Sequence, residues 1–419
     1  MSIGYACITL AKPSINYRRC IQKNATKDTL LEISKWNLDA LSKALDYNDK
    51  NDIKLFRITS DLIPFASSPV NPLPWWEIFK EELTTIGRKI LDNGMRVSMH
   101  PGQYTVLNSP SEDVVHRSIK DLEYHTKLLD SMHLNEEHKI ILHVGGIYDD
   151  KPSAIKRFKL QYKELDASIK KRLIIENDDK CYHIGDVLEL GTDLGIPVVY
   201  DNLHNRLNPY DHTKSDNDFI KLSNTLWKNH DGKQKVHYSQ QALSKVNGSH
   251  STSIEILEFL DFYHSIDQDI DIMLEVKDKN ISAIKCILTT SIFSHEESKQ
   301  KLQKELKAYK LRLLEHSTED YYSLESGINN TTPITFYTTI EDILKKEVKK
   351  DAAINTIKNA LKTLQLSTTE ERNINTRIEQ YKKDTYSLSS LKNLLYKYAL
   401  KQSNPSRDCI DTLIESYYL

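Results

Sequence analysis

Short apolar runs that end at a polar residue recur along the first part of the chain. The clearest two are residues 173–175, which stop at Glu176, and residues 197–200, which stop at Asp201. Apolar runs of this length are typical of buried parallel strands, and the segment between them, 184–194, predicts a crossover helix. The two carboxylates therefore stand at strand ends, where parallel α/β folds carry their chemistry.

The same pattern predicts eight strands, at residues 3–9, 54–59, 95–99, 139–142, 173–175, 197–200, 235–239 and 270–274. Helical periodicity predicts helices between them, at residues 27–47, 75–91, 111–132, 153–166, 184–194, 216–227 and 253–263. Eight strands that alternate with helices over roughly 300 residues predict an α/β protein with a (β/α)8 TIM barrel.

The pattern changes after the eighth strand, from about Glu296 onward. A lysine-rich helix is followed by helical periodicity with breaks at 327–333, 367–369 and 404–406, and no further strand ends at a polar residue. We therefore expect a barrel domain over residues 1–305 and an all-helical C-terminal extension over 306–419. The charges of the extension are mixed in sign, which favours a solvated helical cap or an interaction module.

Composition narrows the classes of function. The formal net charge is −2, so a nucleic-acid site would have to be a local basic patch. No apolar run approaches the roughly 18 residues of a membrane span, and the N-terminal residues lack the pattern of a signal peptide. The five cysteines are scattered without a CxxC pair, which indicates neither a disulfide framework nor a thiolate zinc site. We expect an intracellular protein that is not secreted.

Most of the predicted strands end at a polar residue, and in a barrel these strand ends converge on one mouth. They are His100, His143, Glu176, Asp201, His237 and Glu275. Without metal, the negative charge of these buried carboxylates would be uncompensated. A mixed His/Asp/Glu set suits Zn2+ or Mn2+. The set exceeds what one ion can hold, so we expect two or three ions, with Glu176 on the middle strand as the bridging ligand, and His204 and His250 as further ligands.

Lys235 lies two residues before His237, so both side chains face the same side of their strand. An ammonium group beside several divalent cations is disfavoured. Four alternatives stay open for Lys235. Its amine is neutral, is directed at a substrate phosphate, is chemically modified, or belongs to an ordinary lysine and reaches solvent.

Eight strings of the chain resemble the UV damage endonucleases, TIM-barrel enzymes related to nucleases of the endonuclease IV type. The strings are GYAC (4–7), RITSDLIPFAS (57–67), MHPGQY (99–104), LHVGG (142–146), IIEND (174–178), YDNLH (200–204), KVHYS (235–239) and LEVKDK (274–279). The resemblance covers about residues 1–300 and leaves out the extension.

The resemblance implies a manganese-dependent DNA repair endonuclease, with Zn2+ or Mg2+ as alternatives. It implies a nick immediately 5′ to cyclobutane pyrimidine dimers, 6-4 photoproducts and some abasic sites, and products with a 3′ hydroxyl and a 5′ phosphate. The expected partner is damaged double-stranded DNA, with no membrane, and the expected state is a monomer with access to DNA in the cytoplasm, nucleoid or nucleus.

The resemblance also implies roles for single residues. The family's metal ligands fall on His100, His143, Glu176, Asp201, His204, His237, His250 and Glu275, and its carboxylated lysine falls on Lys235. We expect Glu176, Lys235, His100 and His143 to serve catalysis. Tyr5, Gln103 and Tyr104 match DNA-contacting positions, the last two entering the duplex at the lesion.

Two residues depart from the family pattern. Thr9 stands where an Asn is usual, and Ser68 where a His is expected. If these departures shift the lesion preference, the protein is a narrower abasic-site endonuclease. Two further alternatives are a damage-binding protein of weak catalysis that recruits a partner through its extension, and a sugar isomerase on the same barrel. Basic residues that could contact the DNA backbone are Arg57, Lys180, Arg206, Lys214, Lys245, Lys277 and Lys279.

Overall fold

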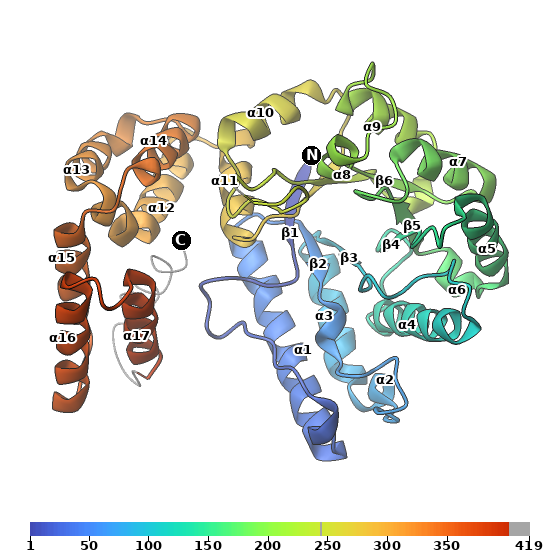
Figure 1. The fold of residues 1–419 in the computed structure, drawn as a ribbon, viewed down its shortest axis with the longest axis horizontal. Coiled ribbons are helices and arrows are strands. Elements are labelled where there is room, and N and C mark those ends of the chain that lie inside the picture. Colours follow the sequence, from blue (N-terminus) through green and yellow to red (C-terminus); the bar gives the residue numbers. More distant parts are fainter. Residues whose placement is uncertain (244, 402–419) are drawn as a thin grey trace. The chain divides into compact units, whose positions relative to one another are not determined.

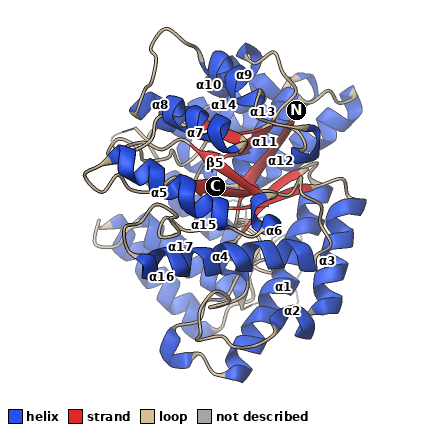
Figure 2. Ribbon diagram, turned by 90° about the vertical axis from the view of Figure 1, so that its right-hand side faces the viewer, coloured by secondary structure: helices blue, strands red, loops and turns tan. Residues whose placement is uncertain are grey.

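The computed structural model describes residues 1–243 and 245–401. Contacts divide the chain into two compact units. The first comprises Met1–Thr9, Ser14–Ile254 and Phe259–Ile284, and the second comprises Leu10–Pro13, Glu255–Glu258 and the chain from Lys285 onward. The first unit consists of strands surrounded by helices, whereas the second is drawn with helices alone (Figures 1 and 2).

The strands of the first unit form a closed barrel in which every pairing is parallel and β1 closes on β8. They are β1 (Ser2–Ala6), β2 (Leu55–Ile58), β3 (Arg96–Met99), β4 (Ile140–His143), β5 (Leu173–Glu176), β6 (Val198–Asp201), β7 (Lys235–Tyr238) and β8 (Asp271–Leu274). This arrangement confirms the predicted TIM barrel. Most strand residues are buried on both faces, which explains why the strands appear in the sequence as short continuous apolar runs.

Helices follow the strands on the outside of the barrel. They are α1 (Lys27–Lys50), α2 (Trp75–Ile78), α3 (Lys80–Asp92), α4 (Glu112–Ser131), α5 (Lys151–Glu164), α6 (Ala167–Lys170), α7 (Ile184–Leu194), α8 (Asn202–Leu207), α9 (Asp216–Asn224), α10 (Ile256–Ser265) and α11 (Asn280–Thr290). The single helix predicted over 75–91 is wrong, because Phe79 leaves the helical backbone conformation (φ −106°, ψ 27°) and buries its ring. Three helices of the barrel unit, α6, α8 and α11, had no counterpart in the prediction.

Buried charged residues lie at the beginnings of several strands. Arg96 at the start of β3 donates to Asp271 at the start of β8 over 2.8 Å. Lys139, just before β4, donates to Asp231 over 2.5 Å. Lys235, the first residue of β7, is paired in register with Asp271. The barrel thus has a charged layer where its strands begin, below the polar residues at which they end.

The second unit is built from helices α12 (His295–His316), α13 (Thr318–Gly327), α14 (Pro333–Lys345), α15 (Lys350–Leu361), α16 (Thr368–Lys382) and α17 (Leu388–Leu400). The predicted breaks coincide with helix starts: Thr332 caps α14, and Ser367 caps α16 in a capping box with Glu370. A separate apolar core that includes Ile357 and Leu395 joins α15 to α17. The break predicted at 404–406 lies outside the described residues.

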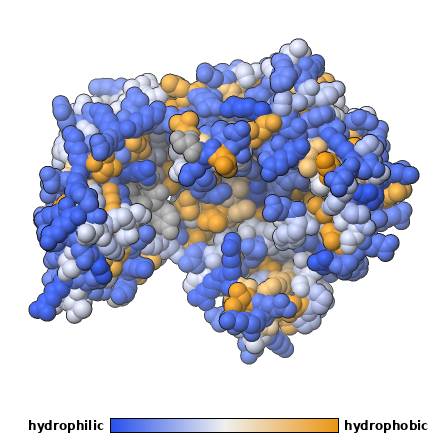
Figure 3. All heavy atoms as spheres, viewed as in Figure 1, coloured by the Kyte–Doolittle hydropathy of each residue, from blue (hydrophilic) through white to orange (hydrophobic). Residues whose placement is uncertain are grey.

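The face shown in Figure 3 is mostly hydrophilic, and its apolar residues form small separate patches. Such scattered apolar residues are normal on a folded protein. Among the described residues, no helix combines the length and the apolar character needed to cross a bilayer.

Gly87 tests how tightly the helices around the barrel are packed. A Cβ atom at Gly87 of α3 would lie 1.7 Å from the carbonyl oxygen of Met132, the C-cap residue of α4. We expect Gly87→Ala to lower the free energy of unfolding by roughly 1–3 kcal/mol, because backbone atoms must shift to make room. Gly327→Ala is the matched control, since the nearest atom to its Cβ would be 3.9 Å away. Equal melting temperatures for the two variants in calorimetry would contradict this account.

Candidate functional site

Strand register brings the predicted ligands together at the barrel mouth. His143 at the end of β4 is the direct partner of Glu176 on β5. Asp201 at the end of β6 is likewise the partner of His237 on β7. Adjacent strands in a sheet lie about 4.8 Å apart, so these pairs are within the reach of a shared ion.

Glu176 is the centre of the cluster and is 1% exposed. One carboxylate oxygen, Oε1, lies 2.6 Å from Nδ1 of His237. The other, Oε2, lies 3.1 Å from Nε2 of His100. Further imidazoles stand close by, with His143 Nε2 at 3.7 Å and His204 Nδ1 at 3.6 Å. A single carboxylate therefore faces four histidines from four different strands or strand ends.

The electrostatics of this cluster keep Glu176 ionised. Burial alone would raise the pKa of Glu176, but the surrounding imidazoles, led by His237 and His143, hold that pKa well below its usual range. Burial lowers the pKa of His143 to about 4, so this imidazole is neutral at neutral pH and its one unprotonated nitrogen can bind a metal.

Arg57 on β2 fixes the orientation of His237. One guanidinium nitrogen donates to His237 Nε2 at 2.9 Å and to Glu275 Oε1 at 2.5 Å. Because a guanidinium only donates hydrogen bonds, Nε2 must accept, and the proton of His237 sits on Nδ1, where it is donated to Glu176. Arg57 is 7% exposed, so it serves the interior of the site rather than the DNA backbone contact considered from the sequence.

Asp201 and His204 form a second arm of the cluster. The carboxylate of Asp201 accepts from the backbone N–H of His204 at 2.8 Å and so caps α8. His204 Nδ1 lies 2.8 Å from the carbonyl oxygen of Asn177, and the Asn177 side chain exchanges two hydrogen bonds with the backbone of Asp201. Burial lowers the pKa of His204, but the carboxylates, led by Asp201 and Glu176, outweigh it and raise the pKa to about 9.

Three groups of side chains in the described residues have ligand atoms close enough to hold a metal ion. They are His100, His143 and Glu176; Glu176, His237 and Glu275; and Glu176, Asp201 and His204. Glu176 belongs to each of them. His250 lies at the edge of this arrangement, with its Nδ1 3.9 Å from Glu275 Oε2.

The chemistry of the donor set fits divalent cations. Imidazole and carboxylate are the ligands of Zn2+ and Mn2+, and the second and third groups each contain two buried or half-buried carboxylates. Among the described residues, Asp201 Oδ2 and His143 Nδ1 are buried without a hydrogen-bond partner. Buried polar atoms normally have partners, so the unpaired carboxylate oxygen of Asp201 is available as a metal ligand.

Lys235 is fully buried one layer below His237, and its amine has no hydrogen-bond partner among the described residues. Burial, followed by the charge of Arg96, lowers the pKa of Lys235 well below its usual range. This direction favours a neutral amine, one of the alternatives left open by the sequence.

The residues expected to contact DNA have very different environments. Gln103 and Tyr104 are exposed on the loop after β3, and Tyr104 is 71% exposed. Tyr5, in contrast, is fully buried, and its hydroxyl hydrogen-bonds to Thr9 Oγ1 at 2.6 Å and Asn48 Oδ1 at 2.8 Å. A direct contact between Tyr5 and DNA is not possible in this conformation, because its ring packs against Phe56 and its hydroxyl is bonded to Asn48 of α1, on the helix-covered face of the strands.

Sequence reasoning missed the residues that support the ligands. Asn177 positions both Asp201 and His204. It lies in the string IIEND (174–178), but no role was predicted for it. Ser60 donates to the carbonyl oxygen of His100 at 2.9 Å and lies 2.9 Å from His125 Nε2. His125 is on α4, far from the strand ends in sequence, so the periodicity of that helix gave no signal for it.

Comparison with known proteins agrees with this geometry. Residues 1–310 match the family described as UV-endonuclease UvdE. The chain belongs to this family. A UV DNA damage endonuclease of Clostridium perfringens (strain 13 / Type A) is 46% identical over 346 residues, which cover 82% of this chain and 83% of that protein. Another, of Bacillus velezensis, is 33% identical over 67% of this chain and 90% of its own length.

A solved structure described as SacUVDE is also similar, with a TM-score of 0.65, 39% identity, and coverage of 68% of this chain and 96% of that one. These findings confirm the resemblance drawn from the eight strings. As a UvdE family member, the chain is an endonuclease that acts in the repair of UV-damaged DNA. Residues 310–409 match a different family, which is described as a protein of unknown function (DUF1722).

The pKa of His204 predicts how metal binding depends on pH. Its folded-state pKa of about 9 exceeds the ordinary value of about 6.5, so its proton stabilises the metal-free fold below pH ~6.5, and this contribution is lost as pH rises through about 9. Metal ions bind neutral imidazole. We therefore expect Mn2+ binding at neutral pH to release about one proton from His204, and the apparent affinity to rise with pH until about 9.

Calorimetry in buffers of different ionisation enthalpy measures this release. His204→Asn should remove most of it, whereas His116→Asn, an exposed histidine on α4, should leave it unchanged. Equal proton release in wild type and His204→Asn would show that the proton comes from another group.

Proposed function

We propose that this protein nicks duplex DNA immediately 5′ to cyclobutane pyrimidine dimers and 6-4 photoproducts, and at some abasic sites, with the aid of two or three divalent metal ions. The products are a 3′ hydroxyl and a 5′ phosphate. The observation that carries the proposal is the set of three ligand groups sharing Glu176 at the mouth of a UvdE-family barrel.

The residues that would hold the ions are the three groups around Glu176, with His250 as a further ligand at the edge. Mn2+ is the proposed metal, with Zn2+ and Mg2+ as alternatives. When bound in such a site, divalent ions activate water and stabilise the charge that develops on a phosphodiester and its leaving oxygen.

The chain's own residues orient these ligands. Arg57 holds His237 in the tautomer that donates to Glu176, and Ser60 and Asn177 fix the positions of His100 and His204. Partners of this kind are worth 10–100-fold in metal affinity or activity. The ligand geometry is thus supported by hydrogen bonds that do not depend on a bound ion.

Gln103 and Tyr104 are proposed to enter the duplex at the lesion. Tyr104 is exposed on a loop that begins four residues earlier at the ligand His100, so a ring that fills a gap in the duplex would hold the phosphate backbone near the metal centre. Unstacking is easiest at a damaged base, so this mode of recognition selects lesions by their weak stacking rather than by sequence.

The first test is Mn2+-dependent nicking of a duplex that carries one thymine dimer. We expect incision just 5′ to the dimer, none in undamaged duplex, and a loss of roughly 10²-fold or more in Glu176→Ala, because even residues that only hydrogen-bond to the metal ligands are worth 10–100-fold. Glu189→Ala, an exposed glutamate on α7, is the matched control.

Gel analysis of end-labelled strands locates the nick and the chemistry of its ends. Cleavage at an abasic site but not at the dimer would favour the narrower abasic-site endonuclease. Tight binding of the dimer duplex without cleavage would favour the damage-binding protein.

We further propose that Lys235 is carboxylated. A neutral, buried amine can attack carbon dioxide, forming an N–C bond and releasing one proton, and the resulting carbamate is an anion suited to a metal site. Protein labelled with ¹³C-bicarbonate should give a carbamate signal in NMR, and Lys235→Arg should abolish it. Lys139→Arg is the control, because the Lys139 amine is buried but already bound to Asp231. No signal in wild type, together with full activity of Lys235→Arg, would exclude the modification.

A further inference from the structure

One turn of α4 faces the loop that follows β3. Asp121 and His125 lie four residues apart on this helix, so their side chains point to the same side of it, and both are buried. The loop begins at the candidate ligand His100, reaches Thr105, and carries the exposed Tyr104 between them. The same helical turn contacts both ends of this loop.

The end of the loop is fixed by direct hydrogen bonds to α4. The Thr105 hydroxyl donates to Asp121 Oδ2 at 2.7 Å. The backbone N–H of Val106 donates to the Ser118 hydroxyl oxygen at 2.9 Å, and Ser118 lies three residues before Asp121 on the same side of the helix. Thr105 is 2% exposed, so water does not compete for the carboxylate at this contact.

The start of the loop is fixed through His125. Its Nε2 lies 2.9 Å from Ser60 Oγ, and Ser60 donates to the carbonyl oxygen of His100 at 2.9 Å. Its Nδ1 lies 2.6 Å from the carbonyl oxygen of Asp121. Because a carbonyl oxygen only accepts, Nδ1 donates this bond, which fixes the orientation of the ring toward Ser60. The positions of His100 and Thr105 are therefore both referred to one rigid helical turn.

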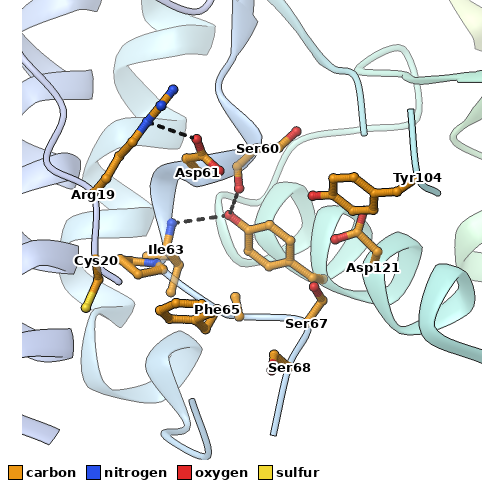
Figure 4. A pocket seen from close by; sticks show the side chains of 13 residues that line it. Arg19, Cys20, Ser60, Asp61, Ile63, Phe65, Ser67, Ser68, Tyr104 and Asp121 are labelled. Atoms are coloured by element: carbon orange, nitrogen blue, oxygen red, sulfur yellow. Dashed lines mark hydrogen bonds and ion pairs between the residues drawn. The ribbon is translucent and has the colours of Figure 1, made fainter. Parts of the chain in front are cut away.

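The ring of Tyr104 depends on these anchors for its position. Asp121, Ser60 and Tyr104 border a cavity of about 260 Å³, which Ser68 of the loop after β2 also lines (Figure 4). The ring lies over Gly102 of its own loop, where a Cβ atom would be 2.5 Å from it. With open space on the cavity side and 71% of the residue exposed, the backbone of the loop determines where the ring stands.

The span between His100 and Tyr104 decides which phosphodiester reaches the metal centre when the ring marks the lesion. Four residues of chain can span up to about 14 Å, so the covalent link alone leaves a wide range of separations. Successive nucleotides of one strand are only roughly 3.4 Å apart along the duplex axis. An unanchored loop would therefore present more than one phosphodiester to the metal ligands.

We propose that Asp121 and His125 are positioning residues that set the register of incision. By holding both ends of the loop against one helical turn, they keep the separation of His100 and Tyr104 constant, so that the phosphodiester next to the lesion is the one cleaved. In this role neither residue contacts DNA or an ion. The inference rests on the proposed incision 5′ to the dimer and on the proposed role of Tyr104.

The first test measures the loop itself, in the full-length protein without metal or DNA. Thr105→Val removes the hydroxyl that donates to Asp121 and keeps the branched side chain, whereas Thr105→Ser keeps the hydroxyl. We expect hydrogen–deuterium exchange of residues 100–107 to be several-fold faster in Thr105→Val and unchanged in Thr105→Ser. His125→Phe should act as Thr105→Val does, and His116→Phe, at an exposed position of α4, should have no effect.

The second test locates the nick in an end-labelled duplex with one thymine dimer, in a single turnover with Mn2+. Wild type and Thr105→Ser should cut one phosphodiester, immediately 5′ to the dimer. Thr105→Val and His125→Phe should also cut neighbouring phosphodiesters, and they should be slower by roughly 10- to 100-fold, the usual worth of residues that only support metal ligands. Binding of the dimer duplex in EDTA should fall far less than the rate, because Tyr104 is present in each variant.

The position of the nick separates positioning from stability, since a less stable fold slows incision without moving the cut. A single nick position in Thr105→Val and His125→Phe, with wild-type incision intact, would overturn the inference and leave the proposed function standing. Unchanged exchange of the loop in both variants would overturn it as well. Absence of incision in wild type would reject the proposed function, and the register with it.

Discussion

The structure of the site depends on one buried carboxylate. Glu176 is 1% exposed and ionised, and it is stable in that state because imidazoles approach both of its oxygens. An unpaired carboxylate in this position would be strongly destabilising. Each of the three ligand groups includes this one residue, so the order of the strands around β5 determines which side chains can share an ion.

Charge is arranged in two layers along the barrel axis. Where strands begin, Arg96 and Asp271 neutralise each other, and where strands end, the ligands surround Glu176. Lys235 lies in the lower layer, in register with Asp271, and the positive charge of Arg96 disfavours a second cation there. This arrangement favours a neutral lysine, and conversion to a carbamate would add a negative charge two residues before His237 on the same strand.

The sequence predicted the barrel and the gathering of the candidate ligands at its mouth, because strand periodicity places the strand ends together whatever the details of packing. It could not predict side-chain direction or partners at residues outside that rule. Arg57 follows a strand pattern and proved to be buried, Tyr5 points into the core, and the helix predicted over 75–91 breaks at Phe79. Asn177 and His125 act through hydrogen bonds between distant segments, and such contacts leave no local signature in a single sequence.

The two departures from the family pattern can now be compared with the site. Thr9 shares its hydroxyl with Tyr5 in the interior, and Ser68 lines the cavity beside Tyr104; neither belongs to a ligand group. Both changes therefore leave the candidate metal ligands intact, and the change at Ser68 alters the wall of the cavity beside Tyr104. A serine in place of a larger imidazole leaves more room at the pocket wall. Differences in activity from relatives should then appear in the binding of damaged DNA before they appear in the chemistry of incision.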